Sequence, residues 1–109
     1  MFPEPERLAV SRGDATLAVW RWGQPAAPPI VLVHGWGDSG ATFAAVASGL
    51  AGDFCLIAPD LRGFGESPPA PGGYWFPDYL RDLDACLDAL VPARPVTLVG
   101  HSMGGNVCG

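Results

Sequence analysis

The segment Val96-Thr97-Leu98-Val99-Gly100-His101-Ser102-Met103-Gly104-Gly105 joins a short apolar run, which predicts a buried strand, to a glycine-rich turn. Within it, the spacing Gly100-x-Ser102-x-Gly104 predicts a nucleophile elbow, a sharp turn from strand into helix that raises the serine oxygen above the sheet edge. Glycine fits both flanking positions because side chains there would collide with the neighbouring strand and helix. We therefore interpret Ser102 as a nucleophile, and the backbone N–H of Met103 as a donor to developing oxyanion charge.

A second apolar run, Ile30-Val31-Leu32-Val33, is typical of a strand buried on both faces of a parallel sheet. It ends in His34-Gly35-Trp36-Gly37. Because the carboxyl ends of parallel strands meet at one edge, we expect the backbone N–H of Trp36 to join that of Met103 in an oxyanion hole. We expect His34 to shape the loop rather than to act as a base.

The rest of the chain alternates strand and helix patterns. Residues 7–11 and 15–22 predict an antiparallel hairpin, residues 54–58 a further buried strand, and residues 39–50 and 77–91 two amphipathic helices. The class is therefore α/β, with a mainly parallel sheet after an N-terminal antiparallel hairpin. The long loop at residues 59–76 is of a length that is usually functional.

Both helices show an apolar stripe with the spacing of one helix face. The first stripe consists of Phe43, Val46, Ala47 and Leu50, with Ser39 or Asp38 as the N-cap, and the second of Leu80, Leu83, Leu87 and Leu90. We expect the acidic residues of the second helix, Asp82 among them, to form a solvated face. Trp20 and Trp22 are expected to pack in the sheet. The cluster Tyr74, Trp75 and Phe76 is expected to pack in the core, with the lining of an acyl pocket as the alternative.

Composition excludes several classes of protein. Hydrophobic residues make up 49% and the mean hydropathy is +0.22, which excludes a disordered tail, and the net charge of -5 disfavours nucleic-acid binding. No apolar run approaches the length of a membrane span, and residues 1–10 lack an export signal, so we expect a cytoplasmic protein. The three cysteines, Cys55, Cys86 and Cys108, contain no Cys-x-x-Cys pair, and we expect no metal, no cofactor and no disulfide framework.

Three signatures together resemble the α/β-hydrolase family. His34-Gly35-Trp36 resembles its oxyanion-loop motif, residues 60–67 (DLRGFGES) its D-x-R-G-x-G-x-S loop, and residues 100–105 (GHSMGG) its elbow, with His101 and Gly105 as supporting residues. The resemblance implies a serine hydrolase with Ser102 as nucleophile, the Trp36 and Met103 amides as oxyanion hole, and small carboxylic esters or related acyl compounds as substrates. We expect the loop at residues 60–67 to be scaffolding rather than catalytic.

The chain departs from the family in one respect. The family's triad runs in the order Ser, then Asp or Glu, then His, and residues 103–109 contain none of the latter three. His101 adjoins the nucleophile and is poorly placed to take its proton. We therefore expect residues 1–109 to be the amino-terminal part of a single domain, a partial fold that ends just after the elbow and is nearly inactive and marginally stable alone. The strand at residues 96–99 would then be an exposed apolar edge.

Two other functions remain open. One is a related reaction on the same elbow, such as hydrolysis of a carbon–carbon bond, thioester or amide, or acyl transfer to peroxide. Ser rather than Asp at position 102 disfavours dehalogenase and epoxide-hydrolase chemistry. The other is a truncated or degenerate copy without catalysis, which binds a ligand or a partner or has no function. Oligomeric state is open.

Overall fold

The computed structural model describes residues 4–12, 15–35, 39–68, 76–92, 94–101 and 103–108. Each expected strand and helix is present, with ends shifted by a few residues at most. In chain order the elements are β1 (Glu6–Arg12), β2 (Ala15–Trp22), β3 (Pro29–Val33), the 3₁₀ helix η1 (Gly40–Phe43), α1 (Ala44–Leu50), β4 (Cys55–Pro59), α2 (Phe76–Leu90), β5 (Thr97–Gly100) and α3 (Met103–Cys108).

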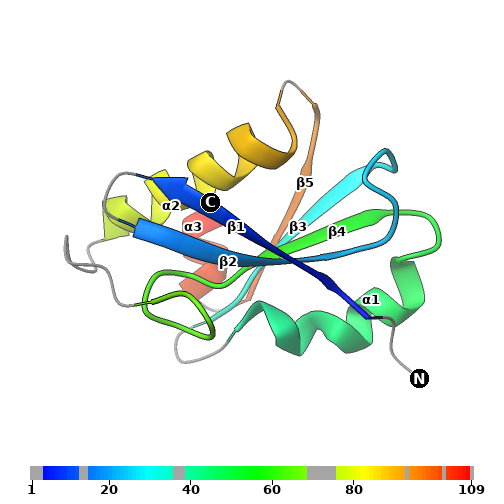
Figure 1. The fold of residues 1–109 in the computed structure, drawn as a ribbon, viewed down its shortest axis with the longest axis horizontal. Coiled ribbons are helices and arrows are strands. Elements are labelled where there is room, and N and C mark those ends of the chain that lie inside the picture. Colours follow the sequence, from blue (N-terminus) through cyan, green and yellow to red (C-terminus); the bar gives the residue numbers. More distant parts are fainter. Residues whose placement is uncertain are drawn as a thin grey trace.

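The strands form one twisted sheet in the order β1-β2-β4-β3-β5 (Figure 1). β3 pairs in parallel with both β4 and β5, whereas β2 is antiparallel to both of its neighbours, β1 and β4. The predicted hairpin and the α/β class are therefore confirmed. The hairpin turn at residues 13–14 lies outside the described residues.

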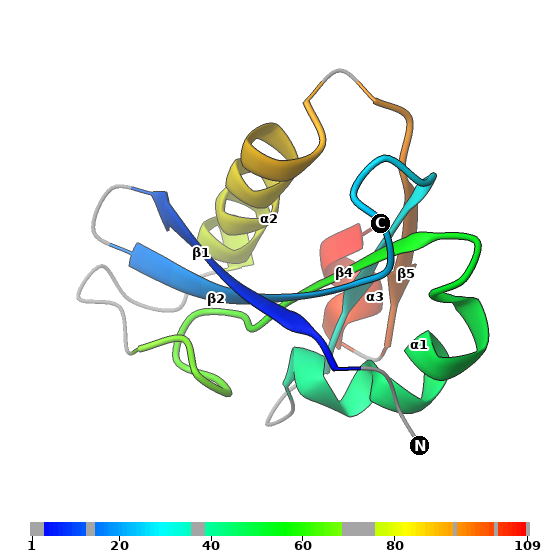
Figure 2. The ribbon, with the colours of Figure 1, turned by 45° about the vertical axis from the view of Figure 1, so that its right-hand side comes forward.

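Helices cover both faces of the sheet, α2 and α3 on one side and α1 on the other (Figures 1 and 2). Successive residues of β3 point to opposite faces, so Val31 and Val33 pack in the cluster under α2 and α3, while Leu32 packs with Ala47 of α1. Val31, Leu32 and Val33 are buried, as the continuous apolar run predicted, whereas Ile30, the first residue of that run, is partly buried. Trp22 lies in the Leu32 cluster, where sheet packing was expected.

The first predicted helix differs from its expected form at its start. It opens as a 3₁₀ turn, and Ser39 makes no side-chain cap hydrogen bond; its carbonyl instead accepts a bond from Thr42 Oγ1 at 2.8 Å. Within α1, Ala47 is fully buried, whereas Val46 is 45% exposed, so the predicted apolar stripe is wrong at Val46. Asp38, the second N-cap candidate, lies outside the described residues.

The solvated acidic face predicted for α2 is wrong at one position. Asp82 is fully buried and forms an ion pair with the equally buried Arg62, Nε to Oδ2 at 2.7 Å. Of the predicted apolar stripe, Leu83 is buried, whereas Leu80 is 36% exposed. The buried face of α2 is therefore rotated relative to the face that the leucine spacing predicted. The residue spacing within α2 could not predict this ion pair, because Arg62 lies 20 residues before Asp82, outside the helix.

β5 was predicted to be a buried strand, and this is wrong. All four of its residues are exposed, including Val99 at 44%. The cause is its place at the end of the described sheet, where β3 is its one strand neighbour. The accompanying expectation of an exposed apolar edge is confirmed for the described residues.

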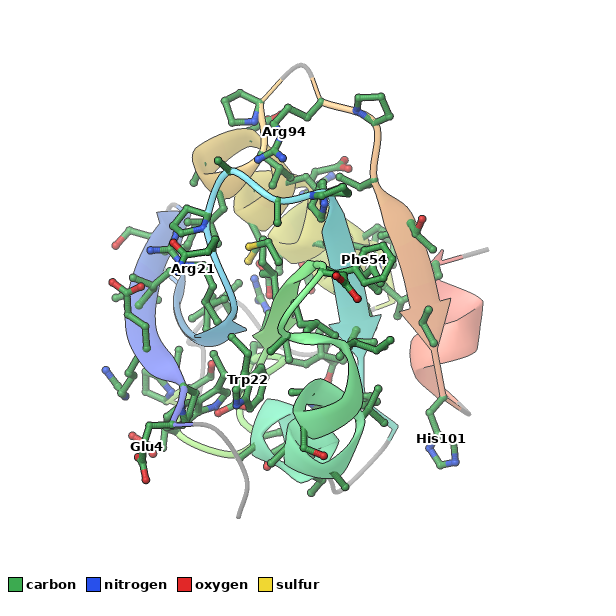
Figure 3. The ribbon with its side chains drawn as sticks, turned by 90° about the vertical axis from the view of Figure 1, so that its right-hand side faces the viewer. Glu4, Arg21, Trp22, Phe54, Arg94 and His101 are labelled. Atoms are coloured by element: carbon green, nitrogen blue, oxygen red, sulfur yellow. The ribbon has the colours of Figure 1, made fainter. Side chains whose placement is uncertain are left out.

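Arg94, before β5, holds the connection between β2 and β3 in place (Figure 3). Its guanidinium donates hydrogen bonds to the backbone carbonyls of Pro25, Ala26 and Ala27 at 3.0, 3.3 and 2.8 Å. The same connection begins at Gly23, whose φ of 86° favours glycine. Among the described residues, no helix has the length and apolar character needed to cross a membrane.

Candidate active site

The carboxyl ends of β3 and β5 lie side by side at one edge of the sheet. Val33 is in register with Gly100, and the N–H of His101 donates to the Val33 carbonyl at 3.0 Å. This pairing brings together two segments far apart in sequence, residues 34–40 after β3 and residues 100–104 at the end of β5. We refer to them as the 34–40 segment and the 100–104 segment.

Glycines allow the 100–104 segment to fold tightly against β3. The N–H of Gly104 donates to the carbonyl of His101 at 3.0 Å, which closes the turn from β5 into α3. A Cβ on Gly104 would overlap the Val33 carbonyl oxygen and would lie 2.6 Å from that of His34. A Cβ on Gly100 would overlap the carbonyl of Gly104. A strand thus leads directly into a helix here, in the order predicted for the elbow.

Gly105, the third glycine of the motif, has a different environment. A Cβ there would lie 3.6 Å from its nearest neighbour, the Gly100 carbonyl oxygen, which is an ordinary contact. The close packing therefore requires glycine at positions 100 and 104 and leaves room for a methyl group at position 105.

Of the three residues predicted to carry the chemistry, Met103 is within the described chain. It is the first residue of α3, where N–H groups have no acceptor within a helix. Ser102, the expected nucleophile, and Trp36, the expected second donor, lie outside the described residues. Their described neighbours are nevertheless brought together, since Gly104 packs on the backbone of His34.

His34 is fully buried and uses both ring nitrogens. Nε2 accepts a hydrogen bond from the N–H of Leu61 at 2.9 Å, so the ring proton is on Nδ1, which donates to the Gly35 carbonyl at 2.7 Å. The ring also meets Phe64 edge-on, with centroids 5.7 Å apart. These contacts agree with a loop-shaping role and leave neither nitrogen free to accept a proton from a nucleophile.

His101, the other histidine of the chain, is exposed, and its ring extends beyond the end of β5, away from the sheet (Figure 3). Its backbone N–H, in contrast, takes part in the β3–β5 pairing.

Asp60 explains what the loop at residues 60–67 does. Its fully buried carboxylate accepts three hydrogen bonds, from Gly40 N–H at 2.6 Å, Glu66 N–H at 2.9 Å and Trp20 Nε1 at 3.1 Å. Gly65 has a φ of 53° and passes so close to this carboxylate that a Cβ would overlap it. These contacts agree with the scaffolding interpretation of the loop.

Ser67 and Arg62 extend this scaffold in two directions. Ser67 Oγ donates to the Asp60 carbonyl at 2.6 Å and accepts from the Ala18 N–H at 2.9 Å, which ties the loop to β2. Arg62 binds Asp82 through two hydrogen bonds of 2.7 and 2.8 Å, which ties it to α2. The connection from Asp60 to Gly40 was not predicted, because the two motifs separately give no signal for it.

The cysteines are unsuited to nucleophilic chemistry. All three are free thiols, and burial raises the pKa of each, that of Cys86 to about 12. The described residues contain no group of three or more His, Cys, Asp and Glu side chains that would hold a metal ion. Tyr74, Trp75 and the side chain of Phe76, considered as core aromatics, lie outside the described residues.

Comparison with protein families and curated sequences gives a consistent result. A family model described as alpha/beta hydrolase fold matches residues 28–109. A serine hydrolase-like protein from Danio rerio is 39% identical over 94% of this chain and 31% of its own length. A non-heme chloroperoxidase from Kitasatospora aureofaciens is 43% identical over 91% of this chain and 35% of its own. The chain thus spans about a third of the length of these relatives.

Solved structures extend the similarity to the fold. The thioesterase domain from the curacin biosynthetic pathway superposes with a TM-score of 0.91 at 30% identity, over 96% of this chain and 40% of that one. A haloalkane dehalogenase loop variant from Bradyrhizobium elkanii gives a TM-score of 0.89 at 28% identity, over 96% and 34%.

Proposed function

Because this chain belongs to the α/β-hydrolase family, we propose that it carries the nucleophile and the oxyanion hole of a serine hydrolase. The observation that carries the proposal is the packing of Gly104 on the backbone of Val33 and His34, which joins the 34–40 and 100–104 segments. Ser102 is the nucleophile, and the backbone N–H groups of Trp36 and Met103 bind the oxyanion. The substrates are small carboxylic esters or related acyl compounds.

In this mechanism the Ser102 oxygen attacks the acyl carbon, and the carbonyl electrons move to an oxygen held by the two N–H groups. Collapse of the tetrahedral intermediate expels the alcohol and leaves an acyl-enzyme, which water hydrolyses. A base must take the serine proton, and neither histidine of the chain is arranged to do so, His34 because both nitrogens are bonded and His101 because it faces outward. We therefore propose that the base and its acidic partner come from outside these residues, and that the chain alone is nearly inactive.

Thioester hydrolysis is the second candidate, supported by the TM-score of 0.91 to a thioesterase domain. Among the remaining related reactions, acyl transfer to peroxide has support in the 43% identity to a non-heme chloroperoxidase. Hydrolysis of a carbon–carbon bond or of an amide, and a truncated copy without catalysis, rank below these two. A cytoplasmic location also remains a proposal, consistent with three unpaired thiols.

A fluorophosphonate probe tests the proposal, because it phosphonylates a serine only when that serine is activated. We expect the full-length protein to be labelled and its Ser102→Ala variant not to be. Ser48→Ala is the matched control, since Ser48 is exposed on α1 and bonds only locally, to the Ala45 carbonyl. Labelling that persists in Ser102→Ala, or that never occurs in the unaltered protein, contradicts the assignment. Rates on matched p-nitrophenyl esters and thioesters then separate the two candidate substrates.

A further inference from the structure

Both ends of the 34–40 segment are held by two consecutive residues that follow β4. At its start, His34 Nε2 accepts from the N–H of Leu61 at 2.9 Å. At its end, the N–H of Gly40 donates to Asp60 Oδ1 at 2.6 Å. All four residues are buried, so these bonds are shielded from competition by water.

The Asp60 carboxylate is itself fixed from several sides. Its other oxygen, Oδ2, accepts from Trp20 Nε1 and from the Glu66 N–H, at 3.1 and 2.9 Å. Its backbone N–H donates to the Ala18 carbonyl of β2 at 2.8 Å. The acceptor that Gly40 meets is thus held by the hairpin and by the following loop, neither of which belongs to the 34–40 segment.

We propose that Asp60 is a positioning residue for the oxyanion hole: it fixes the end of the 34–40 segment, and through it the backbone N–H of Trp36. The inference rests on the proposed function for its catalytic consequence. Asp60 does not touch the substrate and acts through Gly40. Stabilisation of an oxyanion depends steeply on donor placement, and a displacement of about 1 Å lowers the rate by about 100-fold.

The substitution Asp60→Asn tests the bond from Gly40 to Oδ1 separately from the two bonds to Oδ2. An asparagine has one acceptor oxygen and one donor amide in the same volume. We expect the oxygen to face the two donors, Trp20 Nε1 and Glu66 N–H, because that satisfies more groups. The amide then meets the N–H of Gly40, donor against donor, and the end of the 34–40 segment is released.

Ser67→Ala is the matched control. It removes two buried hydrogen bonds from the same scaffold, to the Asp60 carbonyl and from the Ala18 N–H, with no bond to the 34–40 segment. In the full-length protein we expect Asp60→Asn to lower kcat by about 10-fold to 100-fold with KM changed less than about two-fold. Affinity for a trifluoromethyl ketone, which forms a tetrahedral oxyanion on the serine, should fall in parallel. Ser67→Ala should leave kcat within about two-fold, at a similar loss of thermal stability.

Amide hydrogen exchange tests the anchoring without any need for activity. We expect faster exchange in peptides covering residues 34–43 in Asp60→Asn and unchanged exchange there in Ser67→Ala. Unchanged exchange in Asp60→Asn overturns the inference, as does a fall in kcat no larger than that of Ser67→Ala. If the unaltered protein shows no labelling by fluorophosphonate, the proposed function and the catalytic consequence fail together, while the exchange result still decides whether Asp60 anchors the segment.

Discussion

The 34–40 and 100–104 segments follow neighbouring parallel strands and meet at the same sheet edge, yet they are held in place by opposite means. The 34–40 segment is fixed by polar side chains, His34 and Asp60, each of which bonds to a backbone N–H. The 100–104 segment is fixed by missing side chains, since Gly100 and Gly104 let backbone pack directly on backbone.

Because they are held differently, the two segments should respond differently to amino-acid substitutions. Hydrogen bonds can be removed one at a time, so the 34–40 segment should loosen in steps. A Cβ added at Gly100 or Gly104 would overlap a main-chain carbonyl, which cannot move away as a flexible side chain can. The 100–104 segment should therefore either pack or fail to pack.

The largest effect is expected where the scaffold behind the 34–40 segment is itself anchored. Asp82→Ala removes the carboxylate that binds Arg62 through two hydrogen bonds and leaves this buried guanidinium the more distant Asp78 carboxylate, at 4.0 Å. We expect the free energy of unfolding to fall by about 3–4 kcal/mol in urea unfolding of the full-length protein. Asp84→Ala, at an exposed position of the same helix, should change it by less than about 0.5 kcal/mol. Equal effects of the two substitutions would mean that the ion pair does not support the scaffold.

The next effect tests the all-or-none packing of the 100–104 segment. Gly104→Ala places a methyl group into the Val33 carbonyl, and we expect a loss of about 3 kcal/mol in the same measurement. Gly105→Ala has room for its methyl group and should be neutral, or stabilising by up to about 1 kcal/mol through helix propensity. A tolerated Gly104→Ala would remove the distinction between the segments.

His34→Phe tests the stepwise character of the 34–40 segment. The ring volume is largely kept, but the buried N–H of Leu61 loses its acceptor, and we expect a cost of about 2 kcal/mol. Fluorophosphonate labelling should become slower without being lost, because the Asp60 anchor at the other end remains. Complete loss of labelling in a folded variant would instead show that one anchor is indispensable.

The smallest effect is a change of stability with pH that arises at Cys86, which belongs to neither segment. Burial raises the pKa of Cys86 to about 12, from an ordinary 9.0, so the unfolded chain ionises this thiol first as the pH rises. Its stabilising contribution is complete below pH 9 and declines between pH 9 and 12, by about 1.4 kcal/mol per pH unit. Unfolding at pH 8 and pH 10 measures the decline, and Cys86→Ala should reduce it.

The sequence predicted the elements well because continuous apolar runs and helical stripes report local burial. It predicted the glycine requirement of the 100–104 segment for the same reason, since a sharp turn and its residues lie together in the chain. It failed at Asp82, whose partner Arg62 lies on another element, and at Gly40, whose partner is Asp60. Such contacts depend on which strands become neighbours, and β5 shows the same limit, because an apolar run does not reveal whether both of its edges are paired.

Arg94 has a consequence for how this protein can vary in evolution. Its hydrogen bonds to residues 25–27 all go to backbone carbonyls, so side chains at those three positions can change without loss of these bonds. Arg94 itself has no such freedom, since a lysine has one nitrogen where three carbonyls are now met by a planar fork of donors. Among homologous sequences, we therefore expect arginine to be conserved at position 94 while the residues at positions 25–27 vary.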